Sequence, residues 1–186
     1  MTGKGNNVSK HIQIFKGWAE TLRQDADAMK ALVESADADE EARKLAAASL
    51  SYLVTRMDLV PDWSEGIGAL DDVMVLRVCA ALVSGHALGS LPSSAEIDLG
   101  RMGNDVEKIY DFLGGELLGK LKSYCVKLTE STVRGRTPGV ILTDDAARAA
   151  LYADVEEEIK RSGVVVIADA DDAELKLKAY LTHKLG

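Results

Sequence analysis

Four aspartates gathered around a proline are the residues of this sequence whose type and spacing could carry chemistry. Asp58 and Asp62 flank Pro61, and the adjacent pair Asp71 and Asp72 follows after a glycine-containing turn. Carboxylate oxygens are the ligands that Mg²⁺ and Ca²⁺ prefer, so convergence of the four side chains would form a divalent-cation site. The bound cation would then offset the repulsion among four negative charges.

The same segment also has a structural interpretation, which we prefer. In it, the aspartates accept backbone N–H bonds, the proline sets the direction of the chain, the aromatic residue packs inward, and the glycine permits a close approach or a positive φ. The residues concerned are Asp58, Pro61, Asp62, Trp63 and Gly68. Adjacent residues on a helix point about 100° apart, so only one of Asp71 and Asp72 is expected to face the turn. A third interpretation is a docking surface for a partner protein.

The spacing of these residues resembles the core of the YkvA-like family of domains of unknown function. The pattern of that family is an aspartate, two aliphatic residues, Pro-Asp, an aromatic residue, a short turn with a second proline, a glycine, a hydrophobic residue and Asp-Asp. The matching residues are Asp58, Pro61, Asp62, Trp63, Gly68, Leu70, Asp71 and Asp72. Glu65 and Gly66 stand where the family usually has its second proline and an aliphatic residue, so this turn should be less rigid. The resemblance implies an all-helical unit of unknown activity and supplies no catalytic residues.

Other reactive patterns in the sequence lead to no predicted site. The stretch from Gly114 to Lys120 resembles a phosphate-binding loop, but Leu121 replaces the required Ser or Thr and no strand precedes it. The three histidines are isolated, and neither cysteine lies at a zinc-site spacing from one. We therefore predict no catalytic residue and no cofactor, with Mg²⁺ or Ca²⁺ at Asp58, Asp62, Asp71 and Asp72 as the alternative.

The charge of the chain disfavours two classes of partner. Acidic residues number 30 against 22 Lys plus Arg, which gives a net charge of −8, and no stretch clusters basic with aromatic side chains. Nucleic acids and anionic membranes are bound chiefly through such clusters, so neither is expected as the main partner. Cys79 and Cys125 lie in apolar helical patterns and are expected to be buried thiols in a cytoplasmic, reducing compartment.

The most apolar segment, residues 73–95, is predicted to be the buried central helix of a bundle. Arg77 and His86 interrupt it and Pro92 closes it, whereas a membrane-spanning helix needs about 20 consecutive apolar residues. We expect its helix to span residues 68–88, because residues 73–83 are apolar on nearly all sides.

Helical periodicity dominates the rest of the chain, so the expected fold is an all-α or nearly all-α multi-helix bundle. Apolar residues from Val8 to Ala36 form a heptad stripe on one long helix, which either the rest of the chain or a second molecule must cover. Asp37 or Asp39 is expected to cap the next helix, which ends before Pro61. A helix near residues 99–128 should be kinked or divided at Gly114-Gly115.

The expected domain organisation has four parts. Residues 1–7 are expected to be disordered, 8–131 to form the bundle with the motif in 52–88, 132–139 to form a linker, and 140–186 to form a C-terminal helical subdomain packed on the bundle. The β-branched runs 140–142 and 164–167 predict a small two-stranded β element. Between them a helix should start near Thr143 to Asp145, and a final helix should open with a capping box of Asp171 and Glu174.

The function expected from these features is a non-enzymatic protein-interaction or regulatory module that presents the acidic Pro-Asp turn. A protein partner or a homo-oligomer is the expected assembly. The alternatives are a divalent-metal protein or metal-dependent enzyme that uses the four aspartates, and a peripheral membrane protein that attaches through the apolar helix.

Overall fold

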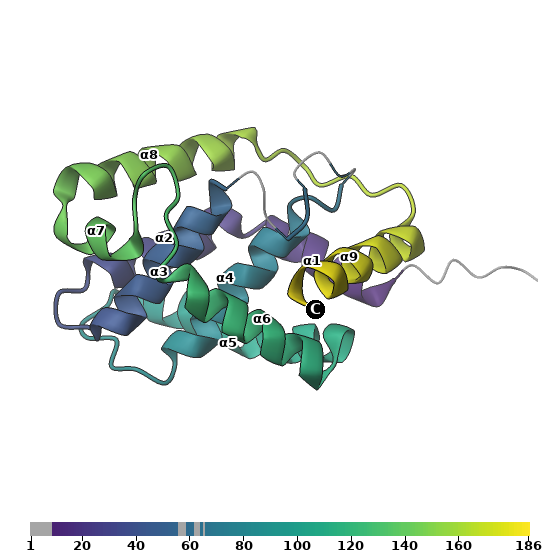
Figure 1. Ribbon diagram of the computed structural model, residues 1–186, viewed down its shortest axis with the longest axis horizontal. Coiled ribbons are helices and arrows are strands. Elements are labelled where there is room, and N and C mark those ends of the chain that lie inside the picture. The colour runs from purple at the N-terminus through teal and green to yellow at the C-terminus, as the bar shows by residue number, and fades with distance from the viewer. Residues whose placement is uncertain (1–8, 56–58, 62–63, 65) are drawn as a thin grey trace, which may run out of the picture.

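The protein is a helical bundle, as a computed structural model shows for residues 9–55, 59–61, 64 and 66–186 (Figure 1). The expectation that residues 1–7 are disordered lies outside the described residues. Within the described ranges the regular elements are all helices: α1 (Lys10–Ala19), α2 (Leu22–Glu34), α3 (Glu40–Leu53), α4 (Leu70–Val83), α5 (Ser93–Leu113), α6 (Gly115–Leu128), α7 (Pro138–Thr143), α8 (Asp145–Arg161) and α9 (Ala170–Leu185). The all-α prediction is confirmed.

Helix α4 lies at the centre of the bundle, as the apolar segment predicted. It packs against α1, α3, α5 and α6, and all its residues from Val73 to Ala80 are buried (Figure 1). A helix covered on every side can be apolar on every side, which explains its lack of a polar face. None of the helices in the described part of the chain is both long and apolar enough to cross a membrane.

The heptad stripe near the N-terminus forms two helices, so the expectation of one long helix was wrong. The chain breaks between α1 and α2, where the one Thr21 hydroxyl hydrogen is shared between the carbonyl oxygen of Trp18 at 3.0 Å and the Asp25 carboxylate at 2.9 Å. Such hydroxyl bonds compete with the helical pattern. The stripe itself is covered within the chain, since Ile12 and Phe15 of α1, and Ala26, Met29 and Val33 of α2, are all fully buried.

The acidic residues before α3 hold a loop instead of capping the helix through their side chains. Asp39 occupies the N-cap position but makes no side-chain cap bond. Its carboxylate accepts from the backbone N–H of Ala87 at 3.1 Å, and Asp37 accepts from that of Ser90 at 3.2 Å. The backbone N–H groups of Asp37 itself and of Ser90 lower the pKa of the Asp37 carboxyl. The two aspartates therefore tie the start of α3 to the loop that follows α4.

The Gly114-Gly115 pair divides the helix predicted near residues 99–128 into α5 and α6. Gly114 has φ 79° and ψ 168°, a conformation that a residue with a Cβ rarely adopts. The chain reverses there, so α6 packs back against both α5 and α4.

The predicted two-stranded β element is absent from the described residues. Residues 140–142 lie in α7, because Thr137 caps that helix by accepting from Val140 N–H and Pro138 supplies the fixed φ favoured at a first helical position. Residues 164–167 form neither a helix nor a strand, and no strand lies beside them in the described ranges. Local capping thus overrode the β-branched composition of the first run and removed the partner of the second.

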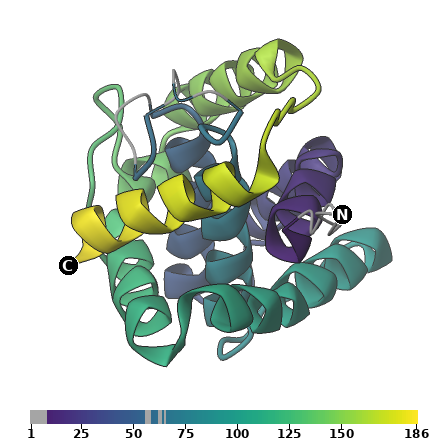
Figure 2. The same ribbon diagram turned by 90° about the vertical axis from the view of Figure 1, so that its right-hand side faces the viewer.

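Helices α8 and α9 pack on opposite parts of the bundle. Asp144 caps α8 as expected, accepting from Ala147 N–H at 3.0 Å. The cap of α9 is Asp169 and not the predicted Asp171, because Asp169 accepts the N–H groups of Asp171 and Asp172. Helix α8 contacts α2, α3 and α7, whereas α9 crosses α1 and α6 (Figure 2).

Candidate functional site

The candidate site is the corner between α3 and α4, where the proline-centred motif lies. Helix α3 ends at Leu53 and α4 begins at Leu70, so residues 52–76 are not one helix. Leu59, Val60 and Ile67 anchor the corner, because their side chains are almost fully buried. The expectations for Asp58, Asp62 and Trp63 lie outside the described residues, as do Arg56 and Glu65.

Tyr52 and Asp71 join the two ends of the corner through a buried hydrogen-bond network. The Tyr52 hydroxyl donates to Oδ2 of Asp71 at 2.6 Å and accepts from the backbone N–H of Leu59 at 3.0 Å. Oδ2 of Asp71 also accepts from the N–H of Val60 at 3.3 Å. Both side chains are buried, so these bonds satisfy donors of the turn that water cannot reach. Asp71 therefore has the structural role that the sequence suggested for the aspartates on either side of Pro61.

Replacing Tyr52 with Phe is expected to lower the free energy of unfolding by about 1–3 kcal/mol, because a buried N–H and a buried carboxylate each lose a partner. Chemical denaturation followed by circular dichroism measures this loss. Tyr180→Phe is the matched control, since its hydroxyl makes only a 3.4 Å contact with Ser64 at the same corner. Equal effects of the two substitutions would contradict the role given to Tyr52.

Gly66 supports the other side of the corner, where the connection between α8 and α9 (residues 162–169) crosses the turn. Its φ is 71°, and a Cβ built on it would lie 2.3 Å from the carbonyl oxygen of Val166. Real Cβ atoms do not approach an oxygen so closely, so this position requires glycine. Gly66 thus lies at a close approach of the corner to the α8–α9 connection.

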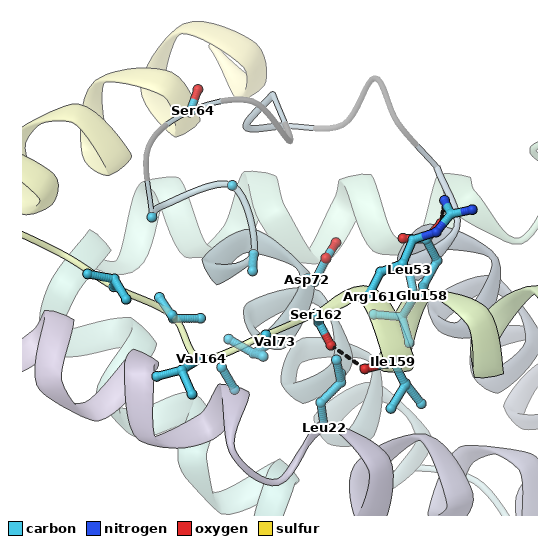
Figure 3. A pocket seen from close by; sticks show the side chains of 17 residues that line it. Leu22, Leu53, Ser64, Asp72, Val73, Glu158, Ile159, Arg161, Ser162 and Val164 are labelled. Carbon is cyan, nitrogen blue, oxygen red and sulfur yellow. Dashed lines mark hydrogen bonds and ion pairs between the residues drawn. The ribbon is translucent and has the colours of Figure 1, made fainter.

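A cavity of about 560 Å³ lies between the corner, the α1–α2 junction, the end of α8 and the α8–α9 connection (Figure 3). Its apolar lining includes Leu22, Leu53, Val73, Ile159 and Val164, and its polar lining includes Ser64, Asp72, Glu158, Arg161 and Ser162. A volume of this size falls in the range of small-ligand sites, which are about 300–1,000 Å³.

The two adjacent aspartates of the motif have different surroundings. Asp71 is fully buried against the turn, whereas Asp72 is half-buried and lines the cavity. Across the cavity Glu158 lies 3.5 Å from Arg161, which also lies 3.9 Å from Glu157. The cavity thus carries two carboxylates, Asp72 and Glu158, and one guanidinium that already contacts other acids.

The predicted metal site stays a prediction, because two of its four aspartates, Asp58 and Asp62, lie outside the described residues. Pro61 and Gly68 lie in the corner with Asp71 and Asp72, but no group of three His, Cys, Asp or Glu side chains in the described ranges could hold a metal ion. Asp71 directs Oδ2 at Tyr52 and the backbone of the turn.

A buried ion network beside the corner was missed in the sequence. Arg77 of α4 has no exposed surface, and it pairs with Asp25 of α2 at 3.1 Å and with Asp105 of α5 at 3.0 Å. Its guanidinium carbon lies 4.3 Å from the ring centroid of Trp18, a cation–π contact. Burial lowers the pKa of Arg77, while Asp25 and Asp105 oppose the shift. A guanidinium stays charged in proteins, so its acidic partners are needed to stabilise this buried charge.

Arg101 completes the network at the surface. It contacts Asp25 and lies 3.3 Å from Asp98, which in turn accepts from Gln24 at 2.6 Å. The signal that could have revealed the network is Arg77 itself, because a charged residue in a helix that is apolar on all sides needs buried acids as partners. The sequence alone did not indicate which acids these were.

The comparison with known proteins identifies a domain family for the corner and its flanking helices. Residues 42–77 match the family described as "Protein of unknown function (DUF1232)". The match runs from α3 through the corner to Arg77, so a family of uncharacterised domains is supported for this segment. No curated protein and no solved structure matches the chain.

Proposed function

We propose that the protein is a non-enzymatic interaction or regulatory module, which binds a short segment of a partner protein in the cavity beside the corner. The observation that carries the proposal is the lining of this cavity. One wall is formed by α8 with the α8–α9 connection, and the other by residues of the matched segment, namely Ser64, Gly66, Gly68, Ala69, Asp72 and Val73. A bound segment would therefore contact the motif directly.

The chemistry of the cavity suggests the kind of segment that fits it. Leu22, Leu53 and Val73 offer an apolar floor, and the two carboxylates Asp72 and Glu158 exceed the one guanidinium, Arg161, by one negative charge. A large apolar side chain beside a Lys or Arg would complement both features, since buried apolar contacts supply affinity and charge complementarity supplies specificity. We further propose that the matched segment is a YkvA-like motif, because Pro61, Gly68, Asp71 and Asp72 keep its spacing.

A phage-displayed library of random dodecapeptides tests the proposal. Peptides enriched on the protein are expected to share a basic residue next to a large apolar one. Their dissociation constants should rise about tenfold or more in Asp72→Asn and in Glu158→Gln, which corresponds to about 1.4 kcal/mol. Glu116→Gln on α6 is the control, because its side chain is 89% exposed and is not part of the cavity lining. Failure to enrich any peptide, or binding insensitive to Asp72 and Glu158, would overturn the proposal.

Calorimetric titration with Mg²⁺, Ca²⁺ and Mn²⁺ distinguishes the metal-binding alternative from the interaction proposal. If the aspartates of the corner form a cation site, millimolar ion should release or absorb heat and raise the melting temperature, because a ligand that binds only the folded state stabilises it. The interaction proposal expects neither effect.

A further inference from the structure

The cavity beside the corner continues into a second cavity of about 490 Å³, which lies along α1 and α2. The lining residues that the two cavities share are Ala19, Leu22, Ile159 and residues 162–165 (Figure 3). The residues of the corner line only the first cavity, whereas Lys16, Glu20 and Arg23 line only the second. The two cavities therefore form one trough, which runs from the corner to Lys16 of α1.

The middle of this trough, where the two cavities meet, is apolar. Val164 is 85% exposed, the highest value among the exposed large hydrophobic side chains of the described residues. Leu22, Ile159 and Val165 are half-buried beside it. Covering such apolar surface in a concave site supplies binding energy. A large apolar side chain of a ligand therefore fits the middle of the trough.

The two ends of the trough carry opposite charges. The corner end has the excess of one carboxylate described above, whereas at the other end Lys16 and Arg23 exceed Glu20 by one positive charge. Arg23 is already engaged, because one of its nitrogens lies 2.9 Å from both carboxylate oxygens of Glu156. Lys16 is half-buried and forms no ion pair with any residue that the structure describes, Glu20 included. Its ammonium group is therefore available to a ligand.

A half-buried ammonium group without a carboxylate partner favours an acidic ligand. Burial removes part of the water that solvates the charge. A carboxylate brought to Lys16 would form a charge-assisted hydrogen bond, which is about twice as strong as one between neutral groups. A basic group of the ligand would be repelled from the same place, so Lys16 also discriminates between the two directions in which a segment could lie.

We propose that the partner segment lies along the whole trough, with its basic residue at the corner, its large apolar side chain in the middle, and an acidic residue at Lys16. This inference rests on the proposed function, and it adds a second charge to the segment and fixes the order of the three residues. A segment bound in the opposite direction would bring like charges together at both ends, which excludes it.

The acidic residue can be tested on the peptide without changing the protein. Peptides selected from the dodecapeptide library should carry Asp or Glu on the side of the apolar residue that lies away from the basic one. Replacing this acid with Asn or Gln in a synthetic peptide should raise its dissociation constant for the wild-type protein at least fivefold, as fluorescence anisotropy measures. The folding of the protein has no influence on this comparison.

An exchange of charges tests the pairing with Lys16. Lys16→Glu should raise the dissociation constant of the selected peptide tenfold or more, and a peptide with Lys in place of its acid should recover most of this loss on the variant. Such a recovery is expected only if the two groups interact directly. Lys10→Glu is the matched control, because Lys10 lies on the same helix, is exposed and lines neither cavity. It changes the net charge equally and should leave the affinity unchanged.

The outcomes distinguish this inference from the proposed function. Selected peptides may depend on Asp72 and Glu158 but bind equally well with and without their acid and to Lys16→Glu. That result would overturn the inference and leave the proposed function standing. Equal losses in Lys10→Glu and Lys16→Glu would indicate a general effect of charge and would also overturn it. A library that yields no binding peptide would overturn both proposals.

Discussion

Replacing Asp25 with Ala is expected to destabilise the protein by about 3–5 kcal/mol, because it leaves the Arg77 charge buried without its main partner. Asp25 and Arg77 both have no exposed surface, so water cannot replace the lost carboxylate. Urea unfolding followed by circular dichroism measures the loss. A decrease of this size is a large share of the stability of an ordinary domain, about 5–15 kcal/mol.

Two further variants separate the charge from the loss of side-chain volume. Asp27 lies on the same helix, but its side chain is 60% exposed and forms an ion pair with Lys30 at 3.5 Å. Exposed ion pairs contribute little, so Asp27→Ala should lower the free energy of unfolding by less than about 0.5 kcal/mol. Combining Asp25→Ala with Arg77→Met should recover part of the stability, since no unpaired charge then remains in the core. If the double variant is less stable than the single one by the full cost of a second deletion, the two residues do not act as a pair.

Gly66→Ala is expected to destabilise the protein by about 2–4 kcal/mol, through a positive φ and a steric overlap. A left-handed conformation costs a residue with a Cβ about 1–2 kcal/mol, and the overlap with Val166 adds to this. Gly135→Ala isolates the first contribution, because Gly135 has φ 76° and nothing within 4 Å of its Cβ position. The difference between the two variants in urea unfolding measures the close approach of the α8–α9 connection.

Limited trypsin digestion locates the structural effect of the same substitution. If the added methyl group of Gly66→Ala displaces residues 162–169, cleavage after Arg161 should become several times faster than in the wild type. Gly135→Ala should leave that rate unchanged. Similar stability losses in both variants, with no change in cleavage, would contradict the contact between Gly66 and Val166.

The sequence predicted the parts of the fold that depend on strong periodicity and on isolated breakers. Helix α4 was recognisable because it is apolar on all sides, and Gly114 ended α5 because its positive φ suits no other residue. The corner between α3 and α4 followed from Pro61, which cannot continue a helix. In each case a single local property decides the structure.

The predictions failed where a local signal competed with another. Residues 140–142 have strand composition, but the cap at Thr137 and Pro138 placed them in α7. The stripe from Val8 to Ala36 has no proline or glycine at residues 20–21, so the break there depends on hydroxyl bonds that composition does not reveal. Contacts of this kind decide whether a short run of residues forms a helix or another structure.

The candidate site was only partly predictable for a similar reason. The motif located the corner, but Tyr52 was not recognised as a partner of Asp71, because hydrogen bonds between residues on different helices leave no spacing pattern. Arg77 and Asp25 are separated by 52 residues in the chain, and they meet because α2 and α4 both pack against α3 and α5. The sequence predicts which residues could do chemistry more readily than which of them meet.

The contact of α9 with α1 implies an order of events during translation. The apolar side chains of α1, Ile12 and Phe15, are fully buried in the finished bundle, and His11 lies 3.3 Å from Glu174 of α9. Ribosomes add about 5–20 residues per second, so α1 emerges on the order of ten seconds or more before α9 exists. The contact between α1 and α9 must therefore form after α1 can already pack against α4 and against Phe112 of α5.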